Sequence, residues 1–426
     1  MAIIKIKNPA IDLDAAEIPN LPASKITSGT LDNARISLDA AEIPNLDTAK
    51  ITTGTLADAR LPANALNSNV SIPNQSAFKN IIINGDMSIA QRGTSFSSVT
   101  STQYTLDRWR WTPGSGTGTF TLSQSTDVPS GQGFAKSFKA DCTATATPSG
   151  TNSIGLKTRF EGQNLQYLKK GTANAESLTL SFWVKSNKTG TYIAELEDND
   201  NSRTINKSYT INSANTWEKK TITYDGDTSG TLNNDNALSF TIVYYINAGS
   251  DLQSGTLQTS WGSLVPANRA VGQVNLADST ANEWYITGVQ LEAGTTASDF
   301  EFLPYDVNLQ RCHRYCLILG DAPGGATYDY ADNGVIGHYY NTTDFYPNFF
   351  FPVPMRSTPG VSFSTTGSGL GDVASQNTAK TGTSAGTNST SSTNINFRVS
   401  TSSANQGSGG AFNFAANDYV ILSAEL

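Results

Sequence analysis

The chain has 426 residues, enough for two or three domains that each bury a hydrophobic core. Only 15% of the residues are charged and 38% are hydrophobic, and long stretches consist of Gly, Ser, Thr and Asn, so the composition favours an all-β fold of short strands joined by turns. The formal net charge of -8 argues against nucleic acid and anionic membranes as partners, because affinity for phosphate groups depends on Lys and Arg.

The beginning of the sequence, "MAIIKIKNPAIDLDAAEIPN", has an apolar patch that is too short for a signal peptide. No apolar run approaches the roughly 18 residues of a membrane-spanning helix. We therefore expect a chain that is made in the cytosol, carries no export signal and does not insert into a membrane.

Residues 1–77 contain no aromatic residue, and all 40 aromatic residues (6 Trp, 16 Tyr and 18 Phe) lie at or beyond Phe78. Residues 11–35 and 36–60 match at 18 of 25 positions without a gap, which defines a repeat of 25 residues. Pro and Gly interrupt each copy and its apolar residues are isolated, so one copy buries little surface. We predict that residues 1–79 form a repeat shaft in a homotrimer, where symmetry-related apolar residues meet on one axis, and the alternative is a disordered linker.

Residues 80–305 show the alternation of period 2 that is typical of half-buried strands. In "ESLTLSFWVKS", Leu180 and Phe182 alternate with Trp183, and "ALSFTIVYYI" has the same pattern, with Tyr244 and Tyr245 on opposite faces. Turn clusters such as "EDNDNS" and "DGDTSG" separate further strands of this kind. This spacing predicts two packed antiparallel sheets, a β-sandwich of jelly-roll type.

Residues 306–319 are the most helix-like stretch, and we predict a connecting helix with Asp306 as its cap. Cys312 and Cys316 would share one face of this helix, but a structural zinc needs four ligands and no second Cys/His pair is close in sequence. We expect free, buried thiols at all three cysteines and no metal site. Residues 320–426 are predicted to form a small β-sandwich, in which "NFFFPV" is a core strand.

A series of short motifs brackets the predicted jelly roll. "NIIINGDMSIAQRGTSF" and "YTLDRWRW" contain Asn-Gly, Gln-Arg-Gly and Asp-Arg-Trp, and the later part contains Val-Gln-Leu-Glu, Phe-Glu and Cys-x-Arg-Tyr. In this order they resemble the large family of phage tail-fibre and tail-associated proteins. The matching residues are Asn84, Gly85, Gln91, Arg92, Gly93, Asp107, Arg108, Trp109, Val289, Gln290, Leu291, Glu292, Phe300, Glu301, Cys312, Arg314 and Tyr315.

The resemblance implies a domain similar to the carbohydrate-binding jelly rolls of glycanases. "KITSGTL" with the later "AR" also looks like a fibre shaft repeat, and the end of the chain resembles a module that often follows this domain. The family thus implies a virion tail protein, made in the host cytoplasm, whose amino terminus contacts tail or baseplate proteins. At His313 and Cys316 the chain departs from the family pattern, which commonly has Gln and Tyr there.

Sugar recognition uses aromatic faces beside polar side chains that bond hydroxyl groups. On this basis we predict glycan contacts from three jelly-roll residues and from a carboxy-terminal region that is rich in Tyr and Asn. For the three jelly-roll residues, the alternative is that loops cover them and their side chains only pack in the fold. The candidates are Trp183, Tyr245, Trp261, Tyr328, Tyr330, Tyr339, Tyr340 and Tyr346.

No catalytic residue and no cofactor are predicted. Two histidines and no G-x-S-x-G motif give little support for a Ser-His-Asp enzyme, whereas the many carboxylates leave a glycosidase open. The acidic loops 197–202 and 225–230 are alternatives for calcium, although solvated turns are the commoner role of such loops. We expect a non-enzymatic, homotrimeric tail fibre that binds host polysaccharide or lipopolysaccharide. The alternatives are a purely structural tail component and a depolymerase.

Overall fold

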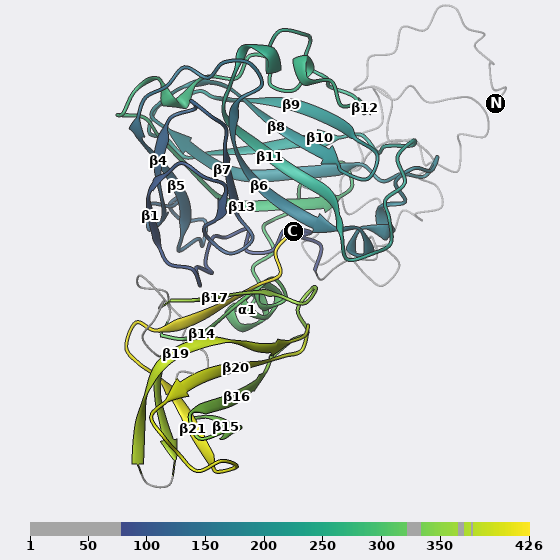
Figure 1. Cartoon of the computed structure of the whole chain (residues 1–426). Coiled ribbons are helices and arrows are strands. Elements are labelled where there is room, and N and C mark those ends of the chain that lie inside the picture. Colours follow the sequence, from purple (N-terminus) through teal and green to yellow (C-terminus); the bar gives the residue numbers. More distant parts are fainter. Residues whose placement is uncertain (1–77, 322–333, 365–369, 376–377) are drawn as a thin grey trace, which may run out of the picture. The chain divides into compact units, whose positions relative to one another are not determined.

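The computed structural model describes residues 78–321, 334–364, 370–375 and 378–426 (Figure 1). These residues form an all-β fold, as the composition predicts. The predicted shaft, with its repeats at 11–35 and 36–60, lies outside the described residues, as do Tyr328 and Tyr330.

The amino-terminal part of the described chain is a β-sandwich of two antiparallel sheets, which confirms the predicted architecture. The first sheet has the order β1 (Ser95–Val99), β4 (Thr119–Ser125), β5 (Ser137–Ala144), β13 (Glu283–Ala293), β7 (Leu178–Ser186) and β10 (Glu218–Tyr224). The second has the order β12 (Gly262–Ser263), β9 (Arg203–Ile211), β8 (Gly190–Asp198), β11 (Leu238–Ala248), β6 (Ser153–Glu161), β3 (Arg110–Pro113) and β2 (Gln103–Tyr104). Short 3-10 helices lie in the connections between these strands, at Gly162–Asn164, Gln166–Leu168, Ser250–Leu252, Pro266–Asn268 and Leu276–Asp278.

Aromatic side chains between the two sheets form the core of the sandwich. Tyr244 of β11 contacts Phe182 of β7 edge to face, with ring centroids 5.3 Å apart, and Trp284 of β13 at 6.4 Å. Trp111 of β3 lies 6.2 Å from Phe138 of β5. Each pair joins one sheet to the other, so the inward positions of the period-2 pattern are the ones that build the core.

The helix after the sandwich is shorter than predicted. It is α1 (Tyr305–His313), and Cys316 begins strand β14 (Cys316–Gly320), whose five residues are all buried. The prediction of a helix to residue 319 was wrong because the apolar run "CLILG" suits a strand that is buried on both faces. Cys312 and Cys316 therefore do not share a helix face, but all three cysteines are free and buried, as expected.

The carboxy-terminal part contains a barrel instead of the predicted small sandwich. Strand β14 joins β22 (Tyr419–Ser423) and β17 (Gly360–Phe363) in a three-stranded sheet. Six further strands close into a barrel in the order β15 (Val335–Tyr339), β16 (Asp344–Phe350), β20 (Asn394–Thr401), β19 (Thr378–Thr390), β18 (Gly371–Ser375) and β21 (Gly409–Phe414). Closure follows from β21, which pairs with both β15 and β18 and leaves no open edge.

The residues that carry the family resemblance form a buried joint at the start of the sandwich. Asn84 has a positive φ of 58°, and its side-chain amide donates to the carbonyls of Ile89 and Asp107, both at 2.9 Å. Gln91 donates to the Asp107 carboxylate at 2.6 Å and to the carbonyl of Cys316 at 3.0 Å. The motif thus ties the first loops of the sandwich to β14, so its primary role in this chain is structural.

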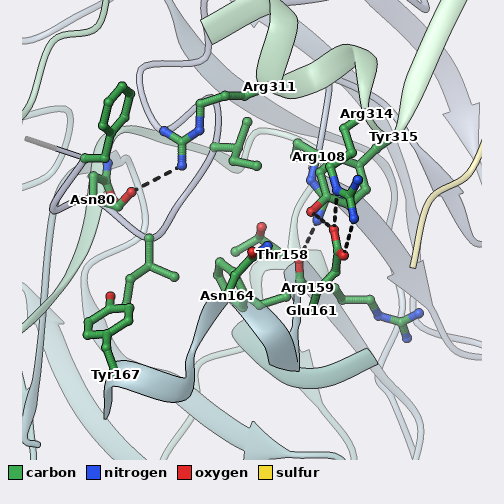
Figure 2. Close-up of a pocket in the computed structure, with 14 residues that line it drawn as sticks. Asn80, Arg108, Thr158, Arg159, Glu161, Asn164, Tyr167, Arg311, Arg314 and Tyr315 are labelled. Carbon is green, nitrogen blue, oxygen red and sulfur yellow. Dashed lines mark hydrogen bonds and ion pairs between the residues drawn. The ribbon is translucent and has the colours of Figure 1, made fainter. Parts of the chain in front are cut away.

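A second part of the joint consists of ion pairs. Glu161 of β6 accepts hydrogen bonds from Arg314 at 2.8 and 2.6 Å and another from the hydroxyl of Tyr315 at 2.5 Å (Figure 2). Burial alone would raise the pKa of Glu161, but the hydrogen bonds from Arg314 and Tyr315 outweigh it and the pKa lies below its usual value. The charged carboxylate therefore holds the residues after α1 against the sandwich.

Candidate functional site

A groove on the outer face of the barrel brings exposed aromatic and amide side chains together. Residues alternate between inside and outside along a strand, and the inward Tyr339, Phe345 and Phe397 are fully buried, so their neighbours point outward. The strand pairing sets His338 opposite Tyr346, and Phe350 opposite Asn394. The groove has a volume of about 650 Å³ and is lined by Ile336, Gly337, His338, Tyr346, Asn348, Phe350, Asn388, Ser389, Asn394 and Asn396.

Large apolar side chains in and beside this groove are open to solvent. Ile336 is 76% exposed and Phe350 is 70% exposed. Tyr346 is partly exposed and contacts the exposed Tyr340 edge to face, with ring centroids 5.7 Å apart. The prediction that "NFFFPV" is a core strand was therefore wrong at Phe350, which points outward. Exposure of this much apolar surface is costly unless a ligand or partner covers it.

Asparagine amides also line the groove and form hydrogen bonds with one another. Asn388 donates to the side-chain oxygen of Asn396 at 2.7 Å, and Asn394 donates to that of Asn348 at 3.3 Å. Asn396 in turn donates to the carbonyl of Pro347 at 3.2 Å. An amide has two donors and an acceptor with two lone pairs, so each of these side chains keeps further capacity for a ligand.

Of the carboxy-terminal candidates that the structure describes, Tyr346 and Tyr340 belong to this region and Tyr339 does not. Tyr339 is fully buried inside the barrel, where its hydroxyl hydrogen-bonds with that of Thr401 at 3.0 Å. The prediction of Tyr339 as a contact residue was wrong because adjacent residues of a strand face opposite sides of the sheet.

Tyr245 is also a core residue and not a contact residue. It is only 3% exposed and packs in a small cluster with Val243, Leu252 and Ala270. Its hydroxyl donates to the Glu195 carboxylate at 3.4 Å. The residues after β11 therefore cover this face of the second sheet, which is the packing alternative that the sequence left open.

The two tryptophan candidates lie on different sheets of the sandwich. Trp183 is a partly exposed residue of β7 in the first sheet. Trp261 lies at the edge of the second, where its indole donates to the Asp225 carbonyl at 2.7 Å and its ring lies 6.0 Å from Phe240. Trp183, Tyr245 and Trp261 therefore do not form one recognition surface.

In the acidic loops that were alternatives for calcium, Asp198 and Asp227 are neutralised by basic side chains. Lys170 forms ion pairs with Asp198 and with Asp227, the latter at 2.9 Å, and Arg203 binds Asp227 at 2.8 Å. Burial would raise the pKa of Asp227, but hydrogen bonds from Arg203 and Lys170 lower it overall. Within the described ranges, no group of three or more His, Cys, Asp or Glu residues is arranged to hold a metal ion.

The sequence missed most of the groove. Ile336, Asn388, Asn394 and Asn396 were not candidates, because their approach depends on the pairing of β15, β16, β20 and β19. One available signal was the alternation in "NINFRVS", where Asn394 and Asn396 flank the inward Ile395.

In the part of the chain that the structure describes, no helix has the length and apolar character to cross a membrane.

No protein-family model and no curated protein matches the chain. Among solved structures it is similar to the enzymatically active domain of tailspike protein 4 of bacteriophage CBA120, with 15% identity and a TM-score of 0.28 over 50% of this chain and 21% of that chain. It is also similar to a putative sugar binding protein from Bacteroides thetaiotaomicron (13% identity, TM-score 0.27, 50% of this chain and 99% of that chain). A third similar structure is the xylan-binding domain from Paenibacillus barcinonensis, with 16% identity and a TM-score of 0.25 over 46% of this chain and 97% of that chain.

The chain thus spans about a fifth of the length of the tailspike domain. At these low identities and TM-scores we draw no functional conclusion from the likenesses.

Proposed function

We propose that the outer barrel groove binds a glycan. The observation that carries this proposal is the exposed Phe350 and the partly exposed Tyr346 beside the amides of Asn348, Asn394 and Asn396. Aromatic rings pack against the apolar faces of sugar rings, while amides donate to and accept from the hydroxyl groups. A volume of about 650 Å³ is within the range of roughly 300–1,000 Å³ of small-ligand sites and has room for a short oligosaccharide.

We further propose that the glycan belongs to a bacterial surface and that the chain is a tail fibre of a phage. This proposal is supported by the resemblance of the Asn84–Trp109 and Val289–Tyr315 motifs to tail-fibre proteins and by the repeat of 25 residues. A homotrimer would present three grooves at once, and several weak contacts together give strong adsorption. Sedimentation of the full chain tests this: we expect three times 45.3 kDa, and a monomer of 45.3 kDa would contradict the trimer.

We propose binding without hydrolysis at this groove. Hydrolysis of glycosides usually requires two carboxyl groups that flank the scissile bond. None of the described residues that line the groove is Asp or Glu. The expected product of incubation with host polysaccharide is therefore unshortened polysaccharide, and shortening that is lost on substitution of a carboxylate pair would indicate a depolymerase.

A glycan array with the purified full chain tests the binding proposal. We expect binding to a bacterial lipopolysaccharide or capsule, with a loss of at least about tenfold in Phe350→Ala. Phe302→Ala is a matched control, because this half-exposed ring belongs to the sandwich and does not line the groove. Absence of binding by the unsubstituted chain to any bacterial glycan would instead favour a purely structural tail component.

A further inference from the structure

A second cavity lies in the sandwich, beside the joint, and shares no lining residue with the barrel groove. It has a volume of about 390 Å³ (Figure 2). Four arginines line it, against a single carboxylate, that of Glu161. This local excess of positive charge contrasts with the net charge of -8 of the whole chain.

One wall of this cavity is already satisfied by protein contacts. Arg314 pairs with Glu161, and the Arg108 guanidinium lies 3.5 Å from the ring centroid of Tyr315 and pairs with Glu425. In Figure 2, Arg108, Glu161, Arg314 and Tyr315 gather on one side of the opening. This wall is structural and leaves the opposite side for a ligand.

Arg311 of α1 faces the opening from the other side and has no carboxylate partner among the described residues. Its guanidinium donates to the carbonyl of Asn80 at 3.5 Å and lies 6.0 Å from the ring of Phe78. A guanidinium has five N–H donors, so most of them are unused. Burial lowers the pKa of Arg311, and the attraction of neighbouring groups such as Glu301 opposes this only in part.

Polar groups without protein partners face Arg311 across the opening. Thr158 is only 1% exposed, and its hydroxyl forms no hydrogen bond with any other described residue. The same holds for the side-chain amide of Asn164 and the hydroxyl of Tyr167 within the described part of the chain. Thr158 is buried, whereas Asn164 is exposed and Tyr167 is partly exposed, so all three keep hydrogen-bonding capacity for a ligand in the cavity.

We propose that this cavity binds a sugar that carries a carboxylate, with the carboxylate on Arg311 and the hydroxyl groups on Thr158 and Asn164. The planar fork of a guanidinium matches a carboxylate. A simple ion such as sulfate would reach Arg311 but leave the opposite wall unbonded and most of the volume empty. The rings of Phe160 and Tyr167 line the cavity and provide apolar surface for the sugar ring.

Calorimetric titration of the full chain with glucuronate as the probe tests the proposal. We expect saturable binding that weakens with added NaCl, and binding of glucose that is at least tenfold weaker. Arg311→Gln should weaken glucuronate binding at least tenfold, and Arg311→Lys, which keeps the charge but loses the fork, should weaken it less. Thr158→Val should also weaken binding, with an unchanged melting temperature as the check on folding.

Two controls separate this site from other effects. Arg398→Gln removes the same charge from an exposed position on the barrel and should leave glucuronate binding unchanged. Tyr346→Ala should also leave it unchanged, since the proposal does not depend on glycan binding by the barrel groove. Equal affinity for glucose, equal affinity in Arg311→Gln, or displacement of glucuronate by sulfate at similar concentration would each overturn the assignment.

Discussion

Arg108 of the sandwich and Glu425, which follows β22, form an ion pair in which the two side chains are only 2% and 5% exposed. Glu425 also pairs with Arg92 at 3.3 Å. Both arginines belong to the motifs that carry the family resemblance. A contact between residues more than 300 positions apart thus fastens the end of the three-stranded sheet to the loops that open the sandwich.

Replacement of Glu425 by Gln should strongly destabilise the chain. The variant removes the ion-pair partner of the buried Arg108 guanidinium and one of Arg92, and breaking a buried pair typically costs about 3–5 kcal/mol in the free energy of unfolding. Urea unfolding measures this loss. Glu283→Gln is the control, because Glu283 pairs with Lys139 at 2.7 Å in a partly exposed position and should cost no more than about 1 kcal/mol. Equal losses in the two variants would contradict a structural role for the buried pair.

Substitution of two adjacent lysines, one buried and one exposed, should also lower the stability of the chain by different amounts. Lys170 is buried and bridges Asp198 and Asp227, whereas Lys169 is exposed and pairs with Glu176 at 2.7 Å. Lys170→Met leaves buried carboxylates partly unpaired and should lower the free energy of unfolding by about 3–5 kcal/mol. Lys169→Met should change it by less than about 1 kcal/mol. The reverse order in thermal or urea unfolding would show that the acidic loops are held by other contacts.

Acid should destabilise the chain through His313. Burial lowers the pKa of His313 to about 4 from an ordinary value of 6.5. Between these pH values the unfolded chain binds a proton that the folded chain does not, so protonation favours unfolding as the pH falls through this range. The loss is about 1.4 kcal/mol per pH unit, or about 3 kcal/mol in total.

His313→Gln should remove this part of the pH dependence, which urea unfolding at pH 7, 5.5 and 4 measures. His338→Gln is the matched control, because it replaces the exposed histidine of the barrel groove with the same residue. If the stability of His313→Gln falls with pH as steeply as that of the unsubstituted chain, carboxylates and not His313 dominate the acid response.

Gly85 should tolerate no side chain. A β-carbon at this position would lie 2.1 Å from the carbonyl oxygen of Val289, which belongs to the backbone of β13 and cannot move aside. Gly85→Ala should therefore cost about 3 kcal/mol or more. At Gly386 the nearest atom would be 3.8 Å away, so Gly386→Ala should stay within about 1 kcal/mol of the unsubstituted chain. A neutral effect of Gly85→Ala would mean that the first loop repacks.

The sandwich could be predicted from the sequence because its signal is local. Leu180, Phe182 and Val184 alternate with Ser181, Trp183 and Lys185, and this alternation sets one apolar face of the strand toward the core. The face at Tyr245 could not be predicted, since its burial depends on Leu252 and Ala270, which come from a later segment without regular period. Alternation identifies the two faces of a strand and does not show what covers each one.

The barrel and its groove depend on pairings between distant segments. Nothing near Val335 indicates that this strand pairs with Phe412, yet this pairing closes the barrel. Likewise Phe349 and Phe350 are chemically equal in the sequence, and only the barrel decides that Phe349 packs inward and Phe350 outward. Tyr346 could be predicted as a groove residue by composition, whereas Asn394, Asn396 and the exposed Phe350 could not.

Stacking and hydrogen bonding at the groove can be separated at Tyr346. Its ring contacts that of Tyr340 at 5.7 Å, and its hydroxyl has no hydrogen-bond partner among the described residues. If sugar binding depends mainly on the ring, Tyr346→Phe should lose less than about threefold in affinity, while Tyr346→Ala should lose about tenfold or more. Titration of both variants with a glycan identified on the array measures the difference. Tyr419→Ala, which removes a tyrosine of β22 outside the groove, should bind as the unsubstituted chain does. If Tyr346→Ala binds the glycan as tightly as the unsubstituted chain does, the glycan binds elsewhere on the chain.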